Sequence, residues 1–167
     1  KVLVSGHSLG GALSHLATAK LINEGYDVPF LYTFASPRVG NKDFANWLNT
    51  KVKLYRFDLE QDMVPHLAPT AKASPTVGSL LPFIGKTLSD DLIVQDYTHS
   101  GASYLIFGSS FIELLRETDE QSDQYYWSSF IGGNFSQLLL TDTGQAKIHT
   151  ENYYTCRLYD IAYIANP

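Results

Sequence analysis

The sequence lacks several features that would place it in common protein classes. Its 167 residues include one cysteine, Cys156, so no disulfide bond can form within the chain, and its apolar neighbours predict a buried, unreactive thiol. No apolar run approaches the ~20 residues that a membrane-spanning helix requires. The net charge is −5 and Lys and Arg do not cluster, which argues against binding to nucleic acid or to anionic membranes.

Metal-binding patterns are missing as well. Histidine and acidic residues are scattered without H-E-x-x-H or Cys/His spacing, so a zinc hydrolase has little support. What the sequence does have is a composition of 44% hydrophobic and 17% charged residues, which is typical of a packed globular protein. The length fits one domain.

The most informative passage lies at the start of the chain. Residues 1–5 contain an apolar run and predict a buried strand, and leucines then recur at helical spacing over residues 13–21. Between them, Gly6–Gly11 contains a G-x-S-x-G nucleophile elbow, in which glycines permit a tight turn and Ser8 projects outward. The backbone N–H of Leu9 then faces the group that Ser8 attacks, as half of an oxyanion hole. Because serine needs an adjacent base, the motif predicts a histidine and a carboxylate further along.

The following elements complete an alternating pattern. A strand–helix–strand unit predicts parallel strands with a right-handed crossover. An irregular stretch at about 68–96 is long for a compact domain, which is typical of functional loops. The expected elements are a helix over 11–24, a strand over 29–35, a loop over 36–41, a helix over 43–49, a strand over 52–57, a helix over 103–117 and a last helix from 150 onward.

The acid of a triad should follow a strand at its carboxyl end. Asp62 fits this position, and Val64 and Pro65 stiffen the chain just beyond it. Asp58 lies nearer the end of the strand and competes with it. Spacing favours Asp62 and leaves Asp58 as the alternative.

Five histidines are candidates for the base. His7 adjoins Ser8 and should point away from the nucleophile, His15 lies on the helix behind the elbow, and His66 is too near Asp62 along the chain. His99 and His149 both follow the acid and lie in expected loops. Location favours His149, between a turn and the last helix, with His99 as the alternative.

Four blocks of the sequence resemble the class 3 lipases, the fungal-type branch of the α/β hydrolases. They are Gly6–Ala12 (GHSLGGA), Tyr32–Asn41 (YTFASPRVGN), Tyr55–Arg56 and Asp62–Leu67 (DMVPHL). Tyr97–Gly101 (YTHSG) resembles the family's aromatic-x-His-x-Gly block, and the rest of the chain matches only loosely. The resemblance is therefore dense over residues 1 to about 67.

The resemblance implies a cofactor-free esterase that acts on acylglycerols or related lipids. It carries the catalytic acid onto Asp62 and the catalytic base onto His149, and it gives His99 a structural role. It also favours secretion, although the sequence leaves the compartment open. Residues 1–167 would then form one partial α/β-hydrolase catalytic domain, a mostly parallel sheet flanked by helices. Its N-terminal strands, lid and second oxyanion donor would lie on another segment, which we expect to complete the fold.

Overall fold

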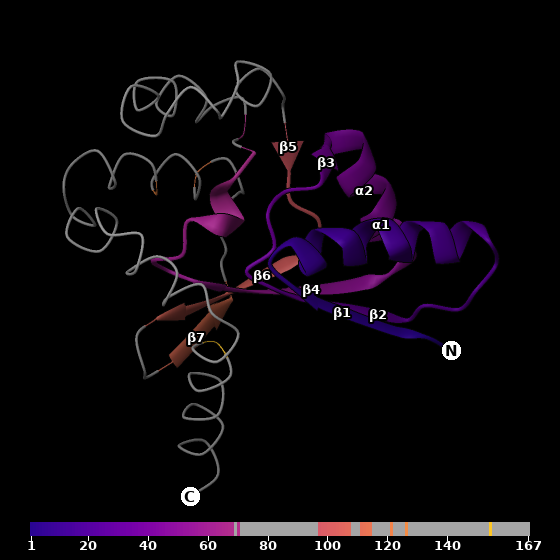
Figure 1. The fold of residues 1–167 in the computed structure, drawn as a ribbon, viewed down its shortest axis with the longest axis horizontal. Coiled ribbons are helices and arrows are strands. Elements are labelled where there is room, and N and C mark those ends of the chain that lie inside the picture. The colour runs from indigo at the N-terminus through magenta and orange to yellow at the C-terminus, as the bar shows by residue number, and fades with distance from the viewer. Residues whose placement is uncertain are drawn as a thin grey trace, which may run out of the picture.

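One mainly parallel sheet organises the described part of the chain (Figure 1). A computed structural model describes residues 1–68, 70, 97–107, 111–114, 121, 126 and 154. The first four strands of the sheet are parallel and the last is antiparallel to its neighbour, which confirms the predicted sheet type. In spatial order the strands are β1 (Leu3–His7), β2 (Phe30–Phe34), β4 (Lys53–Leu59), β6 (Ala102–Phe107) and β7 (Phe111–Leu114).

Two helices cover the same face of this sheet. Helix α1 (Leu9–Asn23) connects β1 to β2, and helix α2 (Lys42–Lys51) lies between β2 and β4. Both connections step across the sheet in the same direction, so right-handed crossovers place both helices on one side. Between helices and sheet lies an apolar core of Val28, Leu31, Leu48, Val52 and Leu54. No helix in the described ranges has the length and apolar character to cross a bilayer.

Helix α1 packs on the sheet through small and polar residues rather than through its leucines. Leu13 and Leu16 are 55% and 51% exposed, whereas Gly11, Ser14 and Thr18 are buried. A Cβ placed on Gly11 would lie 2.7 Å from Cβ of Ser36, which follows β2. The absence of a side chain at Gly11 thus lets the start of α1 lie close to the end of β2.

The buried imidazole of His15 makes stability depend on pH. His15 is 1% exposed, its Nδ1 lies 2.9 Å from the carbonyl oxygen of Gly11, and burial lowers its pKa from 6.5 to about 4. The unfolded chain therefore binds a proton at higher pH than the folded chain, so stability falls as pH drops from about 6.5 towards 4. Between pH 7 and pH 4.5, the free energy of unfolding measured in urea should fall by about 2–3 kcal/mol less in His15→Gln than in wild type. Equal losses in both proteins would contradict this.

The helix expected over residues 103–117 is wrong. Strands β6 and β7 form an antiparallel pair there, with Ile106 opposite Ile112 and Phe107 opposite Phe111. Tyr104 and Ile106 alternate with Ser103 and Leu105 across the two faces of the sheet, and aromatic and β-branched residues favour that arrangement. The loop expected over 36–41 also contains a short strand, β3 (Gly40–Asn41), paired with β5 (Tyr97–Thr98).

Two further boundaries differ from expectation. The first strand runs over Leu3–His7 rather than 1–5, and it is not fully buried, since Leu3 is 69% exposed on the face opposite α1. Strand β4 continues two residues past 57, so Asp58 lies within the strand and not in the loop after it. The predictions for the irregular stretch over 71–96, for the last helix apart from Tyr154, for His149 and for Cys156 lie outside the described residues.

Candidate active site at the carboxyl end of the sheet

Ser8 occupies the turn between β1 and α1. Its backbone has φ 58° and ψ −130°, a left-handed conformation that L-residues avoid and that costs of order 1–3 kcal/mol. The turn is held by the N–H of Ser8, which donates to the carbonyl oxygen of Phe34 at 3.0 Å, and by the N–H groups of Gly11 and Ala12, which donate to the carbonyl of Ser8. This is the strand–turn–helix geometry that a nucleophile elbow requires.

The two glycines that flank Ser8 in the motif differ in importance. A Cβ on Gly6 would collide with the carbonyl oxygen of Gly10 and with the hydroxyl of Ser14, so the turn requires glycine there. A Cβ on Gly10 would meet no described atom within 4 Å. The prediction that the tight turn requires glycine on both sides of Ser8 is therefore confirmed for Gly6 and wrong for Gly10.

Leu9 supplies a backbone donor beside Ser8. It is the first residue of α1, where N–H groups have no acceptor within the helix and where the helix dipole is positive. Its side chain is 68% exposed. An N–H in this position can stabilise negative charge that develops on an atom bonded to Ser8.

Asp62 lies after β4, in a loop that fixes its carboxylate. The residue is fully buried. Its Oδ1 accepts a hydrogen bond from the N–H of Val64 at 2.9 Å, and its Oδ2 accepts one from the hydroxyl of Tyr154 at 2.8 Å. The N–H of Asp62 donates to the carbonyl of Leu59 at 3.0 Å. These contacts hold an acceptor group at the carboxyl end of the sheet, the end that also carries Ser8.

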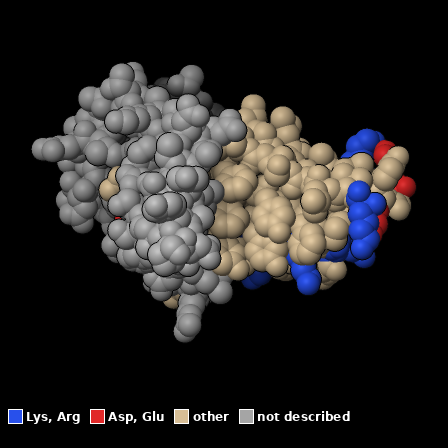
Figure 2. All heavy atoms as spheres, turned by 90° about the horizontal axis from the view of Figure 1, so that it is seen from below, with Lys and Arg blue, Asp and Glu red and all other residues tan. Residues whose placement is uncertain are grey.

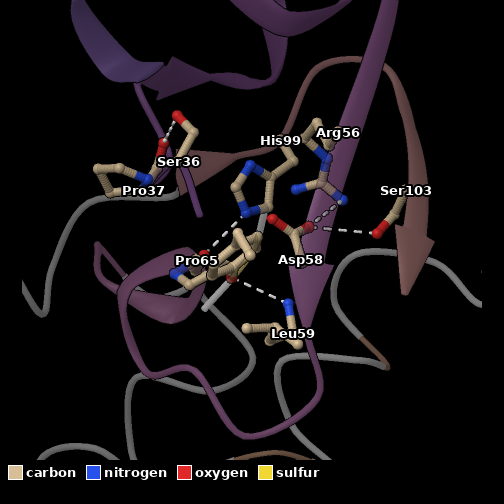
Figure 3. A network of polar contacts seen from close by, with 9 residues as sticks. Ser36, Pro37, Arg56, Asp58, Leu59, Pro65, His99 and Ser103 are labelled. Carbon is tan, nitrogen blue, oxygen red and sulfur yellow. Dashed lines mark hydrogen bonds and ion pairs between the residues drawn. The ribbon is translucent and has the colours of Figure 1, made fainter. Parts of the chain in front are cut away.

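Asp58 is committed to a different environment. Figure 3 shows its carboxylate between Arg56 and Ser103, on the face of the sheet that the helices cover. The hydroxyl of Ser103 donates to Oδ2 at 3.3 Å, and Nη2 of Arg56 lies 3.8 Å from the same oxygen. Burial raises the pKa of Asp58, although the charge of Arg56 opposes this. The carboxyl of Asp58 is therefore already engaged by the Ser103 hydroxyl and the Arg56 guanidinium.

Tyr154 contacts both Asp62 and His7, the residue before Ser8, and no sequence pattern had indicated it. Its hydroxyl donates to Asp62 and accepts from the N–H of Leu59 at 2.9 Å, and its ring contacts that of His7 edge-on at 5.7 Å. Burial and the neighbouring Asp62 raise its pKa well above 10, so it remains a donor. Tyr154 and Asp62 are 92 residues apart, and no local pattern predicts a contact over that separation.

The remaining histidines differ in how the structure places them. His99 lies beside the loop of Asp62, where its Nε2 is 2.8 Å from the carbonyl oxygen of Pro65 (Figure 3). His66 stacks on Tyr126 with ring centroids 3.8 Å apart. The position of His149 lies outside the described residues, so the structure brings together the elbow and Asp62 but leaves the base untested.

The amino-acid sequence of this chain is similar to those of known proteins. Residues 1–72 match the family described as Lipase (class 3). Over 71 residues the chain is 48% identical to a secreted mono- and diacylglycerol lipase of Fusarium solani, covering 41% of this chain and 21% of that protein. It is 46% identical over 76 residues to a lipase of Rhizomucor miehei, covering 42% of this chain and 21% of that protein.

A solved structure extends the similarity beyond the matched sequence. A mutant form of MDLA from Penicillium cyclopium superimposes with a TM-score of 0.53 at 26% identity, covering 75% of this chain and 41% of that one. The chain thus has the α/β-hydrolase fold. It spans about a fifth of the length of the curated relatives it matches.

Proposed function

We propose, from the match of residues 1–72 to the class 3 lipase family, that the protein is a serine hydrolase that cleaves carboxylic ester bonds of lipids. The observation that carries the proposal is the elbow at Ser8 with Asp62 at the same end of the sheet. Tyr154 supports it, because this one side chain contacts both Asp62 and His7, the residue before Ser8.

The proposed reaction proceeds through an acyl-enzyme. The hydroxyl oxygen of Ser8 attacks the ester carbonyl carbon while His149 accepts the hydroxyl proton, and the N–H of Leu9 stabilises the resulting oxyanion. Collapse of the tetrahedral intermediate expels the alcohol, which takes the proton from His149. Water then releases the fatty acid by the same steps. Asp62 orients the imidazole and stabilises its charged form.

The hydroxyl of Tyr154 is expected to stabilise the loop that carries Asp62. Tyr154→Phe removes a hydrogen bond to a buried carboxylate and leaves the N–H of Leu59 without its acceptor, which should lower the free energy of unfolding by about 1–3 kcal/mol. Urea denaturation measures this. Tyr55→Phe is the matched control, since Tyr55 is only half-buried and its ring stacks within the sheet face. Equal stability of the two variants would contradict the role given to the hydroxyl.

Within this proposal the substrate is a triacylglycerol, and other ester classes are the alternatives. Relatives named as mono- and diacylglycerol lipases make partial acylglycerols the second candidate. A phospholipase, a feruloyl-type esterase and a non-catalytic lipase-like binding module remain alternatives. A panel of triolein, diolein, phosphatidylcholine and methyl ferulate separates the enzyme classes. Reaction of Ser8 with a fluorophosphonate separates all of them from a binding module, in which Ser8 should not react.

We further propose that residues 1–167 act together with another polypeptide segment, and that the protein is secreted. The chain spans 41% of the Penicillium lipase it superimposes on, and the second oxyanion donor of this fold comes from a loop after an earlier strand. Since one missing oxyanion donor costs about 10²–10³ in rate, a purified polypeptide of residues 1–167 should hydrolyse p-nitrophenyl butyrate at least a hundredfold more slowly than the complete enzyme. Equal rates of the two would contradict this. Secretion is supported by the names of two relatives.

A further inference from the structure

The end of β2 lies between the nucleophile turn and the strand that leads to Asp62. In the sheet, β2 is the neighbour of both β1 and β4. The carbonyl oxygen of Phe34 accepts a hydrogen bond from the N–H of Ser8 at 3.0 Å, and the N–H of Ala35 donates to the carbonyl of Phe57 at 3.0 Å. The turn after β2 is therefore tied to the elbow on one side and to β4 on the other.

Ala35 forms this turn in a conformation that L-residues seldom adopt. Its φ is 52°, and the chain bends at this residue. The side chain is fully buried in an apolar cluster with Leu59 and Ile106. A left-handed residue other than glycine persists only where its surroundings hold it, and such residues gather at functional sites. The bend leads directly into Ser36.

Ser36 packs against the first turn of α1 without a gap. A Cβ placed on Gly11 would lie 2.7 Å from Cβ, 3.0 Å from Oγ and 3.2 Å from Cα of Ser36. Ser36 is fully buried, and its hydroxyl donates to the carbonyl of Pro37 at 3.0 Å (Figure 3). The start of α1 thus lies as close to the end of β2 as the side chain of Ser36 allows.

The same turn of α1 determines where the N–H of Leu9 points. The N–H groups of Gly11 and Ala12 donate to the carbonyl oxygen of Ser8 at 2.9 and 3.2 Å. That carbonyl belongs to the same planar peptide group as the N–H of Leu9. A shift of Gly11 therefore moves the carbonyl of Ser8, and the donor of Leu9 moves with it.

We propose that Ser36 is a positioning residue for the oxyanion donor. Its contact with Gly11 sets the place of the first turn of α1, and that turn directs the N–H of Leu9. Ser36 acts through Gly11 and not on the substrate. The inference rests on the proposed function, because it concerns the oxyanion of the acyl-transfer reaction. A misplacement of about 1 Å in such a group can cost about 10²-fold in rate.

Paired substitutions in the complete enzyme test this role. Gly11→Ala adds a methyl group where Ser36 leaves no space, and it should lower kcat for p-nitrophenyl butyrate about 10²-fold with little change in KM. Gly11→Ala/Ser36→Gly leaves only Cα of residue 36 near that methyl group, at 3.2 Å, which a shift of a few tenths of an ångström relieves. The double variant should recover to within about tenfold of the wild-type kcat.

Gly40→Ala is the matched control for crowding. A Cβ on Gly40 would lie 2.8 Å from Cδ1 of Phe44, so the same substitution causes a similar clash on β3, away from the elbow. It should leave kcat at the wild-type level even if it lowers the midpoint of urea unfolding. None of these substitutions changes a charge. The charged side chains of described residues seen in Figure 2 gather at the end of the molecule where β1 begins and along one border, so changes in kcat report geometry rather than electrostatic steering.

An infrared measurement reports on the donor itself. p-Nitrophenyl N-butylcarbamate labelled with ¹³C at its carbonyl transfers a slowly hydrolysed carbamoyl group to Ser8 and releases p-nitrophenol. A weaker hydrogen bond to the carbamoyl oxygen raises its carbonyl stretching frequency. The frequency should be higher in Gly11→Ala than in wild type, should return in the double variant and should be unchanged in Gly40→Ala. A purely structural role for Ser36 would lower stability without moving this frequency.

Three results would overturn the proposal. The first is equal kcat and equal carbonyl frequency in Gly11→Ala and Gly40→Ala, and the second is a folded double variant as impaired as Gly11→Ala. If Gly11→Ala does not fold, Ser36→Gly decides, because it only removes atoms: it should lower kcat about tenfold and raise the frequency, and wild-type values of both would be the third. Failure of the proposed function looks different, since the wild-type enzyme would then form no adduct at Ser8.

Discussion

Ser8→Ala is expected to lower kcat for ester hydrolysis by about 10⁶-fold in the complete enzyme. Alanine retains the Cβ and therefore the same constraint at φ 58°, so the variant removes the hydroxyl without changing the turn. In the proposed triad the nucleophile acts as a unit with its base and acid, which is why its loss should remove nearly all of their contribution. Initial rates on p-nitrophenyl esters measure the effect, with KM followed in parallel.

Two results bear on the interpretation of Ser8→Ala. Thermal unfolding and circular dichroism of the variant should match those of the wild type, since the hydroxyl is not needed for the backbone contacts that hold the turn. Ser14→Ala is a useful comparison, because the hydroxyl of Ser14 donates to the carbonyl of Gly10 at 2.7 Å within α1 and should matter little to kcat. Residual activity above a tenth of the wild type in Ser8→Ala would contradict a covalent role for Ser8.

Asp62→Asn should lower kcat by about 10⁴-fold, while Asp58→Asn should change it far less. Both residues are buried aspartates near the end of β4, so the comparison isolates their different surroundings. Asparagine at 62 cannot stabilise an imidazolium and favours the wrong tautomer of the base. Asp58 is held by Ser103 and Arg56 on the helix-covered face, so its carboxyl is engaged there.

Stability must be measured together with the rates of these variants. Asp58→Asn leaves Arg56 without its nearby carboxylate, and the loss of a buried partner can destabilise by about 3–5 kcal/mol. If Asp58→Asn remains folded and loses as much kcat as Asp62→Asn, the assignment of the acid to Asp62 is wrong.

The elbow and its sheet were predictable because local signals there agree. The apolar run, the G-x-S-x-G turn and the leucines after it each indicate strand, turn and helix, and the structure has β1, Ser8 and α1 in that order. The strands predicted over 29–35 and 52–57 correspond to β2 and β4 to within two residues at each end. The right-handed crossover of a strand–helix–strand unit then follows from chirality.

Long-range contacts, and the side of each helix that packs on the sheet, were not predictable from the same signals. The spacing of the leucines predicted a helix but not its inward face: the close approach of Gly11 to Ser36 places small residues inward and leaves Leu13 exposed. The mistaken helix after residue 102 arose because its apolar residues fit helical spacing as well as strand alternation. Tyr154 was missed because its hydrogen bond to Asp62 depends on tertiary packing alone.

The most direct test of the account is the site and rate of fluorophosphonate labelling in the complete enzyme. Mass spectrometry should locate the adduct on Ser8, and His149→Ala should slow its formation by several orders of magnitude. His99→Gln, whose side-chain amide can keep a donor near the Pro65 carbonyl, should label at close to the wild-type rate. An adduct elsewhere, or labelling that depends on His99 and not on His149, would contradict the assignment of nucleophile and base.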